Sequence, residues 1–294
     1  MSTINLKYKF EELYSRALDC ETVLKEVHPV RVVQSIKSIV GINPKEPLHN
    51  LIEFCSIYID GFKISSLDWK FKENNQPEVI TFSDLEIALK SKDLSKSLDN
   101  AYNLSKVSDG RHIIEFLVEF SIKYKLDSFF DIWSVYKMML FLKGKNIEKN
   151  ILFCIYLIVN DSVCSDLTMS TVLDIDFDKY QYDKNNLDLY LIYYSILNED
   201  LVRIDNISRY VKNNLLHFCL FENCNVRKNA NIKQRNLGRL WINEYFKNIK
   251  SKDLSVDLII KFESFRAALK SSNGVNDNML WANLHRYLEN NDSR

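Results

Sequence analysis

The stretch RHIIEFLVEFSIKY, residues 111–124, begins a run of three strongly apolar segments that extends over 110–159. Polar side chains in this stretch recur at helical spacing, and large apolar side chains occupy the other positions. The polar positions are His112, Glu115, Glu119 and Lys123. This pattern predicts a core helix with one stripe that faces water. Two further apolar segments, 129–142 and 151–159 (ILFCIYLIV), predict two more core helices, of which the last is the most enclosed.

The composition argues against fold classes that need many turns. Hydrophobic residues make up 46% of the 294 residues, which is enough for a sizeable core. Only 6 Gly and 4 Pro are present, whereas a β-sandwich or barrel needs a turn roughly every 8–12 residues. We therefore expect an all-α protein, an irregular array of roughly a dozen helices that looks like a helical-repeat protein but has no sequence repeat.

Helical periodicity divides the chain into three parts. Residues 1–160 are predicted to form an N-terminal helical array, which begins with helices over 5–27 and 30–40. Later in this array, Thr81-Phe82-Ser83-Asp84 and Asp93-Leu94-Ser95 each predict a helix start, because a side-chain oxygen there can accept a backbone N–H bond. Periodicity fails over 161–186, which is rich in Asp and is interpreted as an acidic connector. Residues 187–294 resume the helical pattern as a C-terminal unit, in which 227–250 predicts one long basic helix and 276–288 a final amphipathic helix.

The formal net charge is zero, but the two parts of the chain differ in sign. Residues 1–200 carry 23 Lys and Arg against 30 Asp and Glu, and residues 201–294 carry 16 against 9. The most basic segment, 227–252, holds eight cationic residues and a single acid. Five of these cations are candidate partner-binding residues: Arg227, Lys228, Lys233, Arg235 and Arg239.

Two interpretations of this basic segment remain open. Cationic side chains mixed with amides and aromatic residues suit phosphate contacts, which dominate nucleic-acid affinity. Alternatively, the segment is neutralised by a protein partner or by acids of the chain's own connector, namely Asp174, Asp176, Asp178 and Asp183. We favour the second interpretation, because a chain of zero net charge has little long-range attraction for a polyanion.

Histidine and glutamate occur together at helical spacing in the first 120 residues. His112 and Glu115 are three residues apart and His49 and Glu53 are four apart, so each pair shares one face of a predicted helix. Bundles that hold carboxylate-bridged iron use such pairs from several helices. With His28, these residues are candidate ligands of a non-haem iron centre. An exposed face of an amphipathic helix would show the same pattern.

Other recognisable sites are missing from the sequence. Asp174, Asp176 and Asp178 alternate like the start of a calcium loop, but Lys179 stands where that loop needs Gly. No Ser lies in a Gly-flanked nucleophile elbow, and no Gly-rich loop could cradle phosphate. The N-terminus lacks a signal-peptide core and no apolar run approaches the roughly 20 residues that span a bilayer. The six Cys are expected to be free thiols of a soluble cytoplasmic protein with no membrane partner.

Three short motifs follow one another in the first 140 residues. They are Val27-His28 before an apolar helix, Ile57-Tyr58-Ile59-Asp60-x-Phe62, and Asp127-x-x-Phe130 before an aromatic helix. This order resembles all-α bacterial domains that sometimes follow a Rieske-type iron–sulfur module, and helical questin-oxidase-type proteins. The resemblance implies a helical fold. Those families are richer in His along these helices, and Phe130 stands where the resemblance would place a second His besides His28.

The sequence contains no convergent catalytic set, and its two parts carry opposite charge. We therefore expect a non-catalytic helical scaffold or adaptor that binds a protein partner in the cytoplasm. Two alternatives stay open. One is a metal-dependent, iron-containing oxidase built on the His and Glu residues above, and the other is a nucleic-acid-binding protein that uses 227–252.

Overall fold

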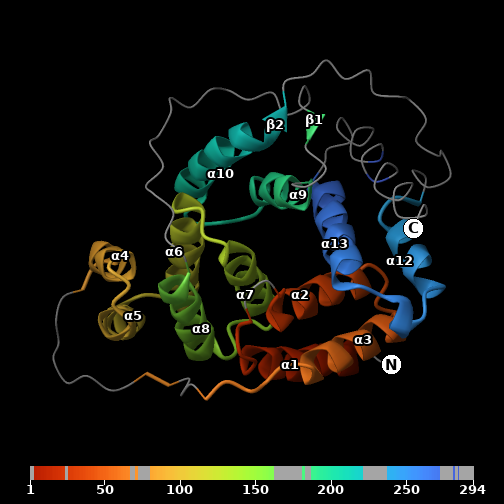
Figure 1. Ribbon diagram of the computed structural model, residues 1–294, viewed down its shortest axis with the longest axis horizontal. Coiled ribbons are helices and arrows are strands. Elements are labelled where there is room, and N and C mark those ends of the chain that lie inside the picture. Colours follow the sequence, from red (N-terminus) through yellow and green to blue (C-terminus); the bar gives the residue numbers. More distant parts are fainter. Residues whose placement is uncertain are drawn as a thin grey trace.

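The structure, a computed structural model, confirms the all-α fold (Figure 1). It describes residues 3–23, 26–66, 70–71, 80–161, 181–182, 187–220, 237–271, 281 and 284. Within these residues the chain forms twelve α-helices, one short 3-10 helix and one pair of two-residue strands. No helix in this part of the chain is both long and apolar enough to cross a membrane.

Three helices form the N-terminal layer in the lower part of Figure 1: α1 (Thr3–Leu18), α2 (Pro29–Val40) and α3 (His49–Asp60). The three helices pack against one another. α2 begins at a proline, whose fixed φ and missing N–H suit the first position of a helix. Each helix buries an apolar face, which includes Phe10 of α1 and Ile36 of α2.

The first helix ends at Leu18 and not near residue 27, so its predicted length was wrong. The residues after it pair with a distant segment instead of continuing the helix. The Glu21 amide donates to the Lys63 carbonyl at 2.8 Å, and the Ser65 amide donates to the Asp19 carbonyl at 2.6 Å. Because every buried backbone group needs a partner, this pairing competes with helix continuation. The periodicity of residues 5–27 does not predict this pairing.

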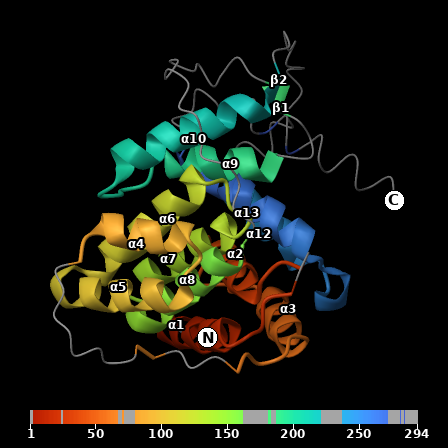
Figure 2. The same cartoon turned by 60° about the vertical axis from the view of Figure 1, so that its left-hand side comes forward.

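α4 (Phe82–Lys90) and α5 (Leu94–Val107) form a hairpin at one side of the molecule, as both views show (Figures 1 and 2). Their starts carry the capping signals that the sequence predicted. Thr81 and Asp84 form a capping box, in which the Asp84 amide donates to Thr81 Oγ1 at 3.3 Å. Asp93 caps α5 by accepting a backbone amide of the first turn at 3.0 Å.

α6 (Gly110–Lys123), α7 (Phe129–Phe141) and α8 (Ile147–Asn160) form the centre of the molecule, and the sequence predicted all three. α6 packs on both α7 and α8, and α7 also packs on α2. α8 starts at Ile147 rather than at residue 151, directly after Asn146, whose φ of 58° is left-handed. Asn tolerates this conformation better than most residues, so it can end the preceding turn.

The middle of the polar stripe of α6 is buried, contrary to the prediction, whereas His112 and Lys123 at its ends are partly exposed. Glu115 is 0% exposed and Glu119 is buried as well. The covering surface comes from the C-terminal part of the chain, because α10 (Ile204–Phe218) packs on α6. Helical spacing identified a polar face of α6, but it could not show which distant element covers that face.

The C-terminal elements pack directly on the N-terminal helices. Besides α10 they are β1 (Gln181–Tyr182), α9 (Leu187–Ile196), β2 (Cys219–Leu220), α12 (Leu240–Lys247), the 3-10 helix η3 (Ser251–Asp253) and α13 (Val256–Ser271). β1 and β2 pair antiparallel. α13 packs on both α9 and α2, and Figure 1 shows it rising from the end of α2 toward α9. Asn50 of α3 donates to the Phe246 and Ile249 carbonyls at 2.8 and 2.6 Å, which ties α12 to the N-terminal layer.

The long basic helix predicted over 227–250 is wrong in its described part. Gly238 has a φ of 52°, a left-handed conformation that interrupts an α-helix, and α12 spans only Leu240–Lys247. Residues 227–236 lie outside the described residues, as do most of the connector 161–186 and most of a helix predicted over 276–288. The domain boundary at the connector therefore stays a prediction.

Candidate functional site

His28 is buried at the N-terminus of α2, and both of its ring nitrogens are engaged. The Val30 amide donates to Nδ1 at 3.3 Å, which leaves Nε2 to donate to the Cys20 carbonyl at 3.3 Å. The ring packs against Phe153 with 4.9 Å between the ring centroids. Burial lowers the pKa of His28 from 6.5 to about 4, so the ring is neutral at pH 7. This histidine is a helix cap, and neither nitrogen points to an open coordination position.

The other predicted iron ligands do not join His28. His49 and Glu53 are exposed on α3, whereas His112 is only partly buried on α6. Among the residues that the structure describes, no three His, Cys, Asp or Glu side chains form a group that could hold a metal ion. All five predicted ligands are described, so they do not form one centre. Helical spacing placed each pair on one face, but packing did not bring the faces together.

Glu115 instead fixes the C-terminal part of the chain to α6. One carboxylate oxygen accepts hydrogen bonds from Arg111 Nε at 2.9 Å and from the Tyr136 hydroxyl at 3.0 Å. The other oxygen accepts from the Val202 and Arg203 amides at 2.9 and 3.3 Å. These amides lie just before α10, so a buried carboxylate faces the positive end of that helix dipole. Its bonds assign Glu115 a structural role.

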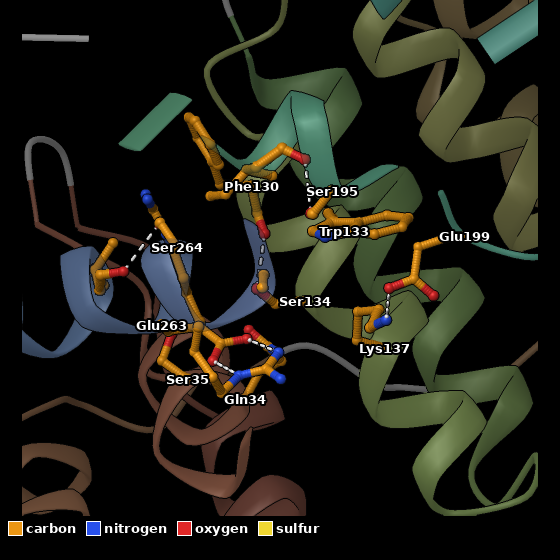
Figure 3. Close-up of a pocket in the computed structure, with 15 residues that line it drawn as sticks. Gln34, Ser35, Phe130, Trp133, Ser134, Lys137, Ser195, Glu199, Glu263 and Ser264 are labelled. Atoms are coloured by element: carbon orange, nitrogen blue, oxygen red, sulfur yellow. Dashed lines mark hydrogen bonds and ion pairs between the residues drawn. The ribbon is translucent and has the colours of Figure 1, made fainter. Parts of the chain in front are cut away.

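A second polar cluster surrounds a small cavity where α2, α7, α9 and α13 meet (Figure 3). We call it the polar chamber. Its charged lining residues are Arg31, Lys137, Glu199, Glu263 and Arg266, and four serines complete the polar wall. The free volume is about 30 Å³, which is room for about one or two water molecules.

Four of the five charged residues of the polar chamber form ion pairs with one another. Glu263 accepts from Arg266 Nη2 at 2.9 Å and from Gln34 Nε2 at 3.2 Å. Lys137 forms an ion pair with Glu199, and Figure 3 shows the two side chains pointing at each other. Serine hydroxyls of the wall donate to carbonyls of their own helices. The polar chamber therefore holds α9 and α13 against α2 and α7 and leaves little room for a substrate.

A larger and more open cavity lies between α1, α2 and α7, and we call it the α1/α2/α7 cavity. Its volume is about 490 Å³, within the range of binding sites for small ligands. The apolar part of its wall comes from Leu6, Phe10, Pro44 and Phe141, and the charged part from Lys7, Glu11, Lys37 and Lys145. An apolar wall with a few polar groups is typical of a binding site.

The charged side chains of the α1/α2/α7 cavity give it a positive balance. Lys145 Nζ lies 2.7 and 2.9 Å from the two carboxylate oxygens of Glu11. This ion pair raises the pKa of Lys145 and neutralises the single acid of the wall. Lys7 and Lys37 contribute the remaining charge.

Lys37 is the most unusual residue of this cavity. Its Nζ lies 5.2 Å from the centroid of the Phe141 ring, and its side chain is half-buried. Burial, which removes water from the ammonium group, lowers the pKa of Lys37 from 10.5 to about 7. The Glu263 carboxylate opposes this shift, and the positive charges of Lys137 and Arg266 add to it. A substantial fraction of Lys37 is therefore unprotonated near pH 7.

The five predicted partner-binding cations fall mostly outside the described residues. Arg239 is described and lies exposed before α12. The residues outside the described part are Arg227, Lys228, Lys233 and Arg235, together with Asp174, Asp176, Asp178 and Asp183 of the acidic connector. Both interpretations of the basic segment, nucleic-acid binding and neutralisation by the connector, therefore stay predictions.

Sequence reasoning did not single out Lys37, Phe141 or Lys145. The signal for Lys37 is weak: it is a lysine within the mostly apolar helix PVRVVQSIKSIV. A lysine in such a segment usually extends its charged end to water. Its burial depends on neighbours from α7 and α13, which the sequence does not place beside it.

Comparison with known proteins adds no assignment. No protein-family model, curated protein or solved structure matches this chain. The resemblance to Rieske-associated and questin-oxidase-type helical domains therefore stays untested.

Proposed function

We propose that this protein is a non-catalytic helical adaptor that binds a partner protein in the cytoplasm. In this proposal the α1/α2/α7 cavity receives an apolar side chain of the partner, and acidic residues beside that side chain meet the lysines of the wall. The cavity carries the proposal, because it is apolar, has a volume of about 490 Å³ and is lined by more cations than anions.

The shape and lining of the cavity suit an anchor side chain. Binding energy at protein interfaces concentrates in a few large side chains that enter well-packed apolar pockets. Phe10 and Phe141 provide aromatic walls for such a side chain. Tyr8, which also lines the cavity, is 62% exposed, so the apolar surface continues outside it. A pocket that is continuous with exposed apolar surface is typical of an interaction site.

The charge of the wall favours an acidic partner segment. Lys7 and Lys145 stand against Glu11 alone, and Lys37 adds a partial positive charge at pH 7. Complementary charge increases the association rate and disfavours partners of the wrong sign. Because the Debye length is about 8 Å at physiological ionic strength, acidic residues must lie close to the anchor to benefit from these lysines.

The interior of the protein supports a scaffold role. Glu115 and the Glu263–Arg266 pair make their hydrogen bonds inside the protein, where they join the C-terminal helices to α6 and α2. A surface that is held in place before binding loses less conformational entropy when a partner binds. A preformed α1/α2/α7 cavity is therefore suited to recognition.

Three buried thiols support the cytoplasmic part of the proposal. Cys20, Cys55 and Cys154 are free and buried in the described part of the chain. Burial raises the pKa of Cys55 to about 12, so this thiol has little thiolate at neutral pH. Free structural cysteines are common in reducing compartments, whereas secreted proteins tend to pair them.

Site-directed photocrosslinking in cells tests the adaptor function. A benzophenone amino acid replaces Tyr8 in one variant and Ile87 of α4, which is 60% exposed and does not line the cavity, in the control. We expect one discrete adduct from position 8, absent from position 87. Its crosslinked peptide should contain an apolar residue next to Asp or Glu.

Charge reversal on the cavity wall sharpens this test. Lys145→Glu should reduce the adduct at least tenfold, because it places a second carboxylate beside Glu11. Lys143→Glu makes the same change of net charge at an exposed residue outside the cavity and should leave the adduct unchanged. Equal adducts from positions 8 and 87, or an adduct that is insensitive to Lys145→Glu, would rule out the α1/α2/α7 cavity as the docking site.

The two alternatives rest on weaker ground. The iron-oxidase hypothesis requires His28, His49, Glu53, His112 and Glu115 to meet, and the structure separates them. The nucleic-acid hypothesis depends on the basic segment 227–252, of which residues 227–236 lie outside the described part of the chain. Elemental analysis of purified protein and salt-dependent titration with DNA and RNA would test them directly.

A further inference from the structure

We infer that Lys37 is a nucleophilic amine that captures an apolar aldehyde as an imine in the α1/α2/α7 cavity. This inference goes beyond the adaptor function and does not depend on it, because a small aldehyde can enter the cavity whether or not a partner protein binds there.

The geometry places the amine beside a space of suitable size. Lys37 lines the cavity, and its Nζ lies 5.2 Å from the centroid of Phe141, which lines the same cavity. A cavity of about 150 Å³ already holds benzene. The α1/α2/α7 cavity has about 490 Å³ and can therefore hold an aromatic or short aliphatic aldehyde. Leu6, Phe10 and Pro44 provide apolar contacts for its hydrocarbon part.

The surroundings of Lys37 also favour the unprotonated amine, which is the form with a free lone pair. Burial lowers the pKa of Lys37 from 10.5 to about 7. The charged groups that act on it are Glu263 and Arg266 of α13, Lys137 of α7 and Glu199 after α9. The other charged residues of the cavity wall are Lys7, Glu11 and Lys145. At pH 7 about half of Lys37 is unprotonated, against roughly one in 3,000 for a lysine of ordinary pKa.

The reaction needs no further reagent. The Lys37 nitrogen attacks the carbonyl carbon, a C–N bond forms, and the carbonyl π-electrons move to oxygen. Both amine protons are transferred to that oxygen, which leaves as water while the nitrogen lone pair completes the C=N bond. A lysine desolvated in an apolar pocket is the arrangement that favours this chemistry in Schiff-base sites.

Reductive trapping tests the inference on the purified full-length chain. The protein is incubated with benzaldehyde for increasing short times at each pH, and excess borohydride is then added, whose hydride reduces the imine carbon and makes the adduct permanent. Peptide mass spectrometry then gives the labelling rate at each lysine between pH 6 and 10. We expect Lys37 to be labelled at least tenfold faster than exposed Lys143 at pH 7, with a rate that levels off above about pH 7–8. Exposed lysines should continue to gain rate toward pH 10.

Two variants complete the test. Lys37→Met should abolish the fast labelling, whereas Lys106→Arg, at an exposed position of α5 outside the cavity, should retain it. If Lys37→Met does not fold, the labelling pattern of the unaltered chain still decides. Labelling of Lys37 that is no faster than that of Lys143, or that rises only near pH 10, overturns the inference. The probe is a small aldehyde and no partner is present, so this failure would not affect the adaptor proposal, and failed crosslinking would not affect Lys37.

Discussion

At the residue scale, the positions most sensitive to substitution are buried charged groups whose hydrogen-bond partners all belong to the protein. Glu115 is the clearest example, because both carboxylate oxygens accept two hydrogen bonds each. We expect Glu115→Gln to lower the free energy of unfolding by about 2–4 kcal/mol, since an amide NH₂ would replace one acceptor and face N–H donors. Urea denaturation followed by circular dichroism measures this change.

The matched control for this substitution lies on α3. Glu53 is exposed, so Glu53→Gln should change the stability by no more than about 0.5 kcal/mol. Similar effects of the two substitutions would mean that Glu115 does not fix α10 to α6 in the way that its hydrogen bonds indicate.

His28 gives the protein a specific pH dependence. Its folded pKa of about 4 lies below the unfolded value of 6.5, so the unfolded state binds more protons between these values. Stability from this residue is therefore fully present above pH 6.5 and is lost as the pH falls toward 4. We expect the unaltered protein to lose about 2 kcal/mol more than His28→Asn between pH 7 and pH 5.

Asn is chosen for this comparison because it can still cap α2. Urea denaturation of both proteins at the two pH values gives the double difference, in which titration of all other groups cancels. Identical pH slopes for the two proteins would show that His28 is not neutral in the folded state.

The candidate sites show how far the role of a single residue can be predicted from the sequence. His112 and Glu115 were correctly placed on one helical face, but their chemistry was misjudged because α10 covers Glu115. Lys37 was overlooked because its pKa depends on burial by other helices. Residue type and spacing predict which side chains share a face. They do not predict how exposed a side chain is or which charges lie near it, because both depend on segments far away in the sequence.

At the element scale, helix starts were predicted better than helix ends. Thr81 and Asp93 mark the starts of α4 and α5 through local chemistry, and the structure confirms both. The second helix was predicted from residue 30 and begins at Pro29. The end of α1 was wrong because pairing between residues 19–21 and 63–65 is not local. The basic helix was wrong because Gly238 adopts a left-handed φ, which glycine permits but does not require.

The contact between the first turns of α6 and α8 depends on a glycine. A Cβ at Gly110 would lie 2.2 Å from Cγ1 and 2.9 Å from Cδ1 of Ile147. We expect Gly110→Ala to destabilise the protein by about 1–3 kcal/mol, because the two helices would have to separate. Thermal or urea denaturation measures the loss.

A second substitution isolates the steric cause. Ile147→Ala removes the two clashing atoms, so the double variant should be less destabilised than the sum of the single variants by at least about 1 kcal/mol. Additive effects would indicate that Gly110 matters for backbone conformation and not for the approach of α8.

At the scale of the whole molecule, the described N-terminal and C-terminal helices are joined mainly by apolar packing and not by attraction between their opposite charges. α13 packs on α2 and α9 through a buried core, and the polar chamber adds specific bonds such as the one between Gln34 and Glu263. The composition was sufficient to predict an all-α array. The arrangement of the C-terminal helices on α2, α6 and α7 was not predictable, because amphipathic faces can be matched in many ways.

This arrangement predicts that the N-terminal and C-terminal helices unfold together. Arg266→Met would leave the Glu263 carboxylate in the polar chamber without its cation, which should cost about 2–4 kcal/mol. Because α13 contacts both α9 and α2, we expect faster native-state hydrogen exchange at the buried amides of all three helices. The opening free energy should fall by the same amount in each helix. Lys261→Met is the control on α13, since Lys261 pairs with Asp257 near the surface at 2.9 Å and should contribute at most about 0.5 kcal/mol. Acceleration confined to α9 and α13, with α2 unchanged, would instead show that the C-terminal helices unfold separately and would support a domain boundary in residues 161–186.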